Sequence, residues 1–263
     1  MIRLGATATE SHMDLCRELE KIFQRQGLDF DWVLYSGYGA MEDAFVRKEI
    51  DLAWNGPLSY LRTKRALNNA CQNLAMRDVD IDFTTHFITQ ADSDITTVED
   101  LHRKRFALGS RNSVQAGLLA YKYLKQSGID PLLDLAACTY HEDRPATNLS
   151  DEQDVIEQIR QCDYYAGAVS KRTLEILEKQ GTLAEARIQV FWSSPGYSHC
   201  CFTAHSGLDA ETAGEVTDAF LSVDPGDAPG KAVLEAEDCH ALVPGINEGW
   251  EFLEQVAEQE ELI

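Results

Sequence analysis

The segment Gly109-Ser110-Arg111-Asn112-Ser113-Val114-Gln115-Ala116-Gly117 contains the residues whose types and spacing are best suited to chemistry. The apolar pattern around it predicts a strand that ends where the segment begins and a helix over its second half. Such a junction presents unpaired backbone N–H groups and the positive end of a helix dipole, so it can bind an anion without a basic residue. We therefore predict an anion site with Ser110, Asn112, Ser113 and Gln115 as its side chains.

Helix capping is a second interpretation of the same segment. Asn112 is a residue type that caps helices, and Gln115 stands three residues later, as in a capping box. The segment lacks the Gly-Lys-Ser/Thr ending of a Walker loop, and the chain has no Gly-x-Ser-x-Gly, His-Glu-x-x-His or dinucleotide glycine motif. We therefore assign no catalytic residue, and we expect no enzymatic turnover.

Strand and helix patterns alternate along the chain, and they must position this segment. The predicted strands cover residues 1–7, 31–35, 51–54, 82–90, 105–109, 136–140, 165–169, 188–192 and 199–204. The predicted helices cover residues 15–23, 40–49, 97–101, 114–126, 150–161 and 170–180, and the chain after residue 209 is predicted to be helical. Right-handed crossovers between such strands build parallel sheets, whose ligand sites lie at the carboxyl ends of the strands.

The order of these elements predicts an α/β protein with two Rossmann-like lobes. Two predicted crossings, near residues 83–90 and 192–200, would form a two-segment hinge with a ligand cleft between the lobes. Lobe one is predicted to contain residues 1–85 and 200–263. Lobe two is predicted to contain residues 86–199, including the anion site at the helix start.

Composition limits the partners and the compartment. The 263 residues include 23 Lys+Arg and 44 Asp+Glu, a formal charge of -21, which excludes nucleic acid or an anionic membrane held by a basic surface. An anion held by aligned N–H donors inside a cleft remains compatible with this charge. No apolar run reaches the roughly 18 residues of a membrane span. The absence of a leader before the first strand predicts a cytoplasmic protein; removal of a signal peptide would instead imply a periplasmic or membrane-associated one.

The seven cysteines form no CxxC pair, which indicates free thiols. A metal site is one interpretation of His199-Cys200-Cys201 and Cys239-His240. Their spacing fits no closed zinc motif, and thiols in or beside a buried strand commonly pack in the core. We therefore assign no metal ligand and no cofactor.

Several motifs follow one another as in the phosphate/phosphonate-binding components of ABC transporters. They lie at residues 51–60, 97–101, 106–109, 112–113, 127–131, 165–169 and 191–195, continuing through 202–203. The chain resembles this family over nearly its whole length. The resemblance implies a type II periplasmic-binding-protein fold, two lobes that close over a small oxyanion such as phosphate or phosphonate, and an ABC permease as a possible partner.

The resemblance also implies particular ligand-binding residues. Tyr38 stands where the family places an aromatic hydroxyl on the ligand, and Asn55 lies in the first matching motif. Ser113 matches the start of the family's Ser-Thr-Ser signature, but Val114 and Gln115 follow it, so two hydroxyl donors are missing.

In lobe two the resemblance implies two further residues. His141 belongs to a pair like the family's His-Glu pair, and Ser170 stands where aminophosphonate binders have an acidic residue. Packing of Tyr38 at a helix start and a surface-loop position for His141 remain alternative interpretations. The segment 143–151 is longer than the family pattern and is predicted to be a specificity loop or lid.

A solute-binding protein is thus the leading hypothesis. The alternative is a cytosolic enzyme or ligand sensor that reuses the fold and depends on a metal or a thiol, because no signal peptide is seen, seven thiols are present and the Ser-Thr-Ser signature is incomplete. Cys200 and Cys201 also weakly resemble the Cys-rich motif of the pyrimidine synthases of thiamine biosynthesis. A structural protein with a vestigial cleft is a third possibility.

Overall fold

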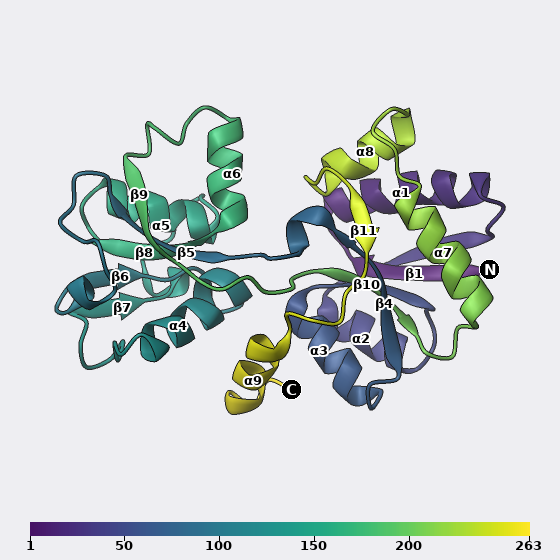
Figure 1. Cartoon of the computed structure of the whole chain (residues 1–263), viewed down its shortest axis with the longest axis horizontal. Coiled ribbons are helices and arrows are strands. Elements are labelled where there is room, and N and C mark those ends of the chain that lie inside the picture. Colours follow the sequence, from purple (N-terminus) through teal and green to yellow (C-terminus); the bar gives the residue numbers. More distant parts are fainter. The chain divides into compact units, whose positions relative to one another are not determined.

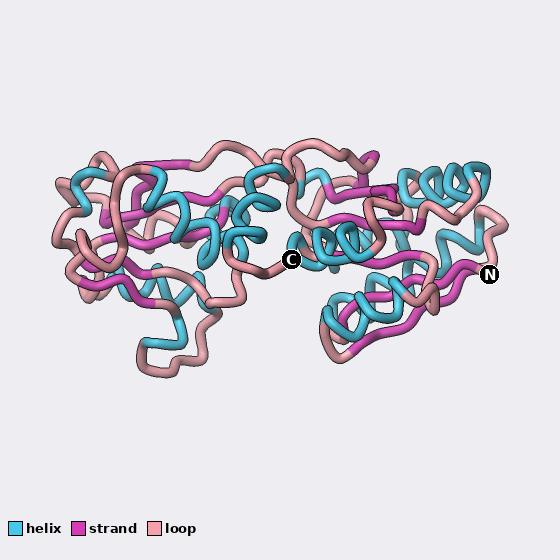
Figure 2. Tube along the Cα trace, turned by 90° about the horizontal axis from the view of Figure 1, so that it is seen from below, coloured by secondary structure: helices cyan, strands magenta, loops and turns pink.

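The computed structural model describes all 263 residues and divides into two units. Unit 1 contains Met1–Asp82 and Tyr197–Ile263, and unit 2 contains Phe83–Gly196. The chain therefore passes from unit 1 to unit 2 and back, and each unit has its own sheet with helices on both faces (Figures 1 and 2). None of the helices is both long enough and apolar enough to cross a membrane.

Unit 1 contains a six-stranded sheet in the order β11-β4-β10-β3-β1-β2. Its strands are β1 (Ile2–Thr7), β2 (Phe30–Tyr35), β3 (Leu52–Asn55), β4 (Cys71–Arg77), β10 (Cys201–His205) and β11 (Leu242–Pro244). Strand β1 is parallel to β2 and β3, whereas β10 is antiparallel to β3 and β4. The carboxyl ends of β1, β2 and β3 consequently meet at one edge, which we call the unit 1 edge.

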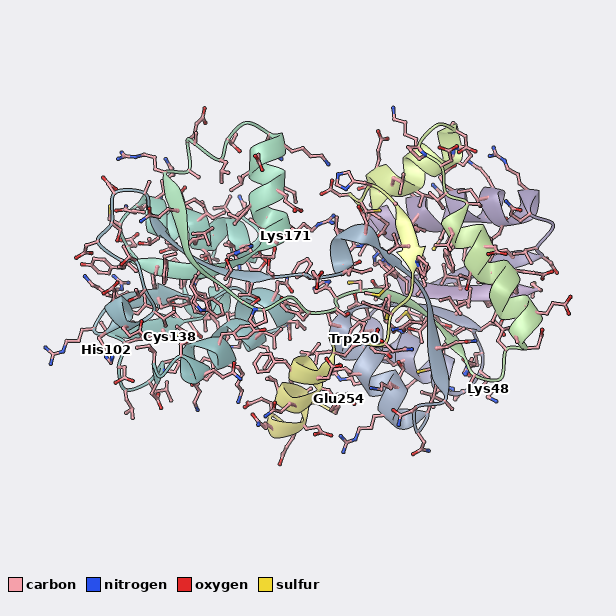
Figure 3. The ribbon with its side chains drawn as sticks, in the orientation of Figure 1. Lys48, His102, Cys138, Lys171, Trp250 and Glu254 are labelled. Atoms are coloured by element: carbon pink, nitrogen blue, oxygen red, sulfur yellow. The ribbon has the colours of Figure 1, made fainter.

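Helices cover both faces of this sheet (Figure 1). They are α1 (Glu10–Arg25), α7 (Ala210–Leu221) and α8 (Ala228–Ala236) on one face, and α2 (Tyr38–Val46) and α3 (Pro57–Ala66) on the other. Buried aromatic rings join the first layer to the sheet: Phe202 stacks on Trp54 at 4.1 Å and on Phe220 at 4.4 Å between ring centroids. Helix α9 (Glu251–Gln259) packs against α3 through Trp250 and Glu254, which Figure 3 labels.

Unit 2 contains a five-stranded sheet in the order β7-β6-β8-β5-β9. Its strands are β5 (Thr85–Gln90), β6 (Arg105–Ala107), β7 (Ala137–Thr139), β8 (Ala166–Ser170) and β9 (Ile188–Ser193). Strand β6 is parallel to β7 and β8, and β5 is antiparallel to β8 and β9. The carboxyl ends of β6, β7 and β8 thus meet at a second edge, the unit 2 edge.

The helices of unit 2 include two that pack on β8 and one that follows the predicted anion segment. They are α5 (Asp151–Arg160), α6 (Lys171–Lys179) and α4 (Ala120–Gln126), which is preceded by the π-helical turn η3 (Val114–Leu119). Gly167 permits the close packing of α5, because a Cβ there would lie 2.5 Å from Val155 Cγ1. Three short 3-10 helices complete the chain: η1 (Asp78–Asp80), η2 (Glu99–Leu101) and η4 (His141–Asp143).

The alternation of strands and helices agrees with the sequence prediction, with some differences. Sequence patterns did not reveal β4 or α3, and the closing segment after residue 209 includes β11 as well as helices. The predicted helix 114–126 begins as a π turn before it becomes α-helical. The loop between η4 and α5 has no regular structure, although Ser150 begins α5 with the predicted capping box.

Candidate functional site

Each strand at the unit 1 edge leads directly into a helix. Thr9 caps α1, and its hydroxyl accepts a hydrogen bond from the His12 backbone N–H at 3.1 Å. The helices α2 and α3 begin at Gly37 and Gly56, which provide no side-chain cap. Because no side-chain hydrogen bond caps these two helix starts, their N–H groups and dipoles remain suited to an anion.

Tyr38 lies at the start of α2 and is 40% exposed. Its ring packs on Gly56, where an added Cβ would lie 2.9 Å from the Tyr38 hydroxyl oxygen. Desolvation raises the pKa of this phenol, and the nearby Cys200 raises it further. The hydroxyl therefore keeps its proton at neutral pH and can act as a donor to an oxyanion, as its sequence position suggested.

Asn55, in contrast, is only 1% exposed. Its amide donates to Thr203 Oγ1 at 3.1 Å, and its carbonyl oxygen accepts from Ser59 Oγ at 2.8 Å. These bonds join β3 to β10 and to α3. The Asn55 side chain thus fixes the local backbone at the unit 1 edge, and its position is that of a structural link.

The unit 2 edge brings the loops after β6, β7 and β8 together. These loops carry Ser110, His141 and Ser170, which the sequence placed at three separate strand ends. Lys171 begins α6 directly after Ser170, and Cys138 lies on β7 (Figure 3). The parallel pairing of the strands accounts for this convergence.

The donors of the Ser110 loop hold carboxylates of the protein itself. Ser110 Oγ donates to Glu142 Oε1 at 2.6 Å, and the Arg111 backbone N–H donates to both Glu142 oxygens at 3.2 and 3.1 Å. The Ser110 backbone N–H donates to Asp151 Oδ2 at 2.8 Å. Desolvation raises the pKa of Glu142, but these hydrogen bonds outweigh it and leave the pKa lowered. The loop is therefore an oxyanion-binding structure, and in this structure its partners are intramolecular.

Gln115 and Ser170 converge on a third carboxylate, that of Glu152. Gln115 Nε2 donates to Glu152 Oε1 at 3.1 Å, while the Ser170 N–H and hydroxyl donate to Oε2 at 2.7 and 2.8 Å. Thr173 Oγ1 donates to the same oxygen at 2.5 Å. Glu152 is 5% exposed, so burial and four donors hold its carboxylate in place.

Ser113 and Asn112 have different roles from those suggested by the capping interpretation. Ser113 is the residue that caps the helix, since its hydroxyl accepts from the Ala116 N–H at 3.2 Å. Asn112 is exposed, and its backbone N–H donates to Ser110 Oγ at 3.1 Å. The capping interpretation therefore placed the cap one residue too early, at Asn112 instead of Ser113.

His141 is held by a buried ion pair. Its Nδ1 lies 3.0 Å from Asp154 Oδ2, and Arg144 Nε donates to the same oxygen at 2.7 Å. Arg144 also donates to the carbonyl oxygens of Leu108 and Thr139, both at 2.8 Å, so it ties together the ends of β6 and β7. Desolvation raises the pKa of Asp154, but its bonds to His141 and Arg144 outweigh this and lower it. This anchoring leaves the His141 Nε2 as the ring nitrogen that can meet a ligand.

The sequence did not reveal several residues that shape these edges. Glu152, Thr173 and Arg144 bind the predicted residues. Thr9 and Ser11, whose hydroxyl oxygens lie 3.2 Å apart, stand at the start of α1 after β1. The acidic first turn of α5, with Asp151, Glu152 and Asp154, was a visible signal. It is equally well explained by the helix dipole, which conceals its contacts with distant loops.

The chain has the architecture of the type II periplasmic-binding-protein class, with two α/β units joined by two chain segments and donors at the carboxyl edges of their sheets. The chain belongs to the family described as ABC transporter, phosphonate, periplasmic substrate-binding protein, whose model matches residues 5–250. This family assignment confirms the resemblance inferred from the motifs.

Individual relatives are similar along the whole chain. A probable ABC transporter phosphite binding protein, PhnD1 of Prochlorococcus marinus, is 19% identical over 97% of this chain and 88% of its own length. The structure of PhnD1 in complex with methylphosphonate covers 100% of this chain and 98% of that one, with 20% identity and a TM-score of 0.71.

Two further solved structures share the fold. XAC2383 from Xanthomonas citri bound to chloride ion is 16% identical, with a TM-score of 0.72 and coverage of 100% and 99% of the two chains. The periplasmic aliphatic sulphonate binding protein SsuA from Escherichia coli is 14% identical, with a TM-score of 0.63 and coverage of 100% and 93%. The predicted fold class is confirmed. The family is described as periplasmic, so the cytoplasmic assignment and the enzyme alternative receive no support.

Proposed function

We propose that this protein binds a small phosphonate or related phosphorus oxyanion and delivers it to an ABC permease. The observation that carries the proposal is the Ser110 loop, whose hydroxyl and backbone N–H groups hold the carboxylates of Glu142 and Asp151. Donors arranged around a carboxylate have the spacing and polarity that suit a phosphonate oxygen. An incoming oxyanion would replace Glu142 at these donors.

Each unit contributes a different part of the proposed site. Unit 1 supplies the protonated Tyr38 hydroxyl and the N–H groups at the starts of α2 and α3. Unit 2 supplies the Ser110 loop with Asn112 and the His141 imidazole. In the proposal the ligand joins the two edges, the units close about the two connecting segments, and the permease recognises the closed form.

Calorimetric titration of the full chain tests this function. The panel is methylphosphonate, phosphite, phosphate and sulfate, each titrated into protein whose folding has been verified by circular dichroism. We expect one site per chain, with a phosphorus oxyanion binding more tightly than sulfate. Heat from none of the phosphorus compounds with folded protein would refute the proposal.

Single substitutions locate the site on the two edges. Tyr38→Phe and His141→Leu each remove one polar side chain that would contact a charged oxygen, a loss of about 1.5 kcal/mol or more, or roughly tenfold in affinity. Tyr165→Phe is the matched control, because Tyr165 is 51% exposed and belongs to neither edge loop. Equal affinities for all three variants would show that the ligand binds elsewhere.

A further inference from the structure

Asp80, His199 and Cys200 form a compact cluster beside the unit 1 edge, next to the pairing of Cys201 with Asn55 at the end of β3. His199 Nδ1 lies 3.1 Å from Asp80 Oδ1 and 3.1 Å from Cys200 Sγ. The three ligand atoms all lie within 4.8 Å of one another. Asp80 ends η1, just before the chain leaves unit 1 at Asp82, and the other two follow its return at Tyr197. The cluster thus joins the unit 1 ends of both connecting segments.

The spacing of these atoms fits a single metal ion. Zinc binds imidazole nitrogen at about 2.0–2.1 Å, carboxylate oxygen at about 2.0–2.2 Å and thiolate sulfur at about 2.3 Å. Tetrahedral angles then place neighbouring ligand atoms roughly 3.3–3.6 Å apart. The two separations of 3.1 Å need to lengthen by only a few tenths of an ångström, which side-chain rotation can supply.

The charges around the cluster also favour a bound cation. The Arg77 guanidinium donates to both oxygens of Asp80 and to Glu237 Oε2, and all three groups are buried. Two carboxylates and one guanidinium give a net charge of about -1, and burying an unbalanced charge is costly. A divalent ion that displaces the Cys200 thiol proton adds one net positive charge, so the buried group becomes neutral.

We propose that Asp80, His199 and Cys200 bind a divalent transition-metal ion of the zinc type, with the fourth position held by water. Borderline metals suit a set of one nitrogen, one oxygen and one sulfur ligand. Asp80 is 119 residues from His199, so local spacing did not reveal this set and the sequence favoured a packing role for the thiols. The ion connects the unit 1 ends of the two segments that link the units, and its three ligands are side chains that the proposed oxyanion site does not use.

Cobalt titration tests the site without any phosphonate. Chelator-treated, dialysed full-length protein is titrated with Co²⁺, and the near-ultraviolet charge-transfer band of a cobalt–thiolate bond is followed. We expect the band to saturate at one ion per chain and to be abolished by Zn²⁺. Zinc at about one hundred times its Kd is expected to raise Tm by roughly 5–10 °C.

Variants separate this site from adventitious thiol binding. Cys200→Ser is expected to abolish the band, and His199→Gln to weaken cobalt binding at least tenfold. Cys162→Ser is the control, because Cys162 is an exposed thiol in unit 2. Folded wild-type protein without a band, or a band that survives Cys200→Ser, overturns the proposal. Circular dichroism establishes that each variant is folded.

Discussion

Replacing Arg144 with Met should disrupt the internal support of the unit 2 edge. The Arg144 side chain is 2% exposed and donates to Asp154, Leu108 and Thr139. Met fills a similar volume but provides no positive charge and no donor. The Asp154 carboxylate, also buried, would keep only His141 and Gln158 as partners.

The magnitude follows from the burial of this ion pair. Removing one partner of a buried pair costs about 3–5 kcal/mol, because an uncompensated charge remains inside the protein. The remaining bonds to Asp154 place Arg144→Met near the lower end, about 3 kcal/mol. The double variant Arg144→Met/Asp154→Leu, which removes both charges, should recover about 1 kcal/mol or more of that loss.

Urea denaturation monitored by circular dichroism measures these changes. Arg160→Ala, on the helix α5 that carries Asp154, is the control, since its pair with Glu157 is largely exposed and should contribute less than about 1 kcal/mol. The lowered pKa of Asp154 also predicts a pH dependence. The ionised carboxylate stabilises the folded protein above the pKa of Asp in the unfolded chain, about 3.9, and this stabilisation is lost as the pH falls through the lower pKa of the folded protein. A loss below about 1 kcal/mol for Arg144→Met, or a double variant less stable than both single variants, would refute the reasoning.

Three further predictions concern other parts of the chain. Glu142→Gln should bind methylphosphonate about fivefold to tenfold more tightly in calorimetry, because a neutral side chain competes less well for the Ser110 donors; weaker binding would contradict intramolecular competition. Burial raises the pKa of Glu42, and its Oε1 has no hydrogen-bond partner. The ionised side chain therefore destabilises the folded protein as the pH rises above the pKa of Glu in the unfolded chain, about 4.3. Glu42→Gln should therefore be more stable in urea by about 1 kcal/mol at pH 7, with a smaller gain at pH 4; an unchanged midpoint at pH 7 would exclude this cost. Gly167→Ala should lose about 1–3 kcal/mol, because the new Cβ would overlap Val155, and an unaltered Tm would contradict that clash.

Sequence patterns alone predicted most of the architecture. Helix α1 and the parallel strands have clear apolar patterns, so their order already implied two α/β series. Strand β4 was missed because it begins Cys71-Gln72-Asn73, a polar and half-exposed start without alternation. Antiparallel pairing with β10 and β11 determines its conformation, and both partners are distant in sequence. Tertiary contacts of this kind leave little trace in a local pattern.

The candidate site was predictable in position but not in its contacts. Parallel strands must bring their carboxyl ends to one edge, so the loops of Ser110 and His141 could be located from the sequence. Their partners are carboxylates from helix α5, such as Asp151, which is 41 residues from Ser110. Nothing in the local sequence distinguishes an acid that meets a distant loop from one that complements the helix dipole.

The central position of β10 determines the order in which the two units can fold. Strand β10 lies between β3 and β4, yet it belongs to the part of the chain that follows all of unit 2. During synthesis, residues 1–82 therefore form a sheet with a missing middle strand, and unpaired edges of this kind are prone to aggregation. Unit 2 is continuous in sequence and can complete its core first. A nascent chain that stops before residue 201 should hence contain a folded unit 2 and an incomplete unit 1. Such an intermediate exposes unpaired strand edges that chaperones would need to protect.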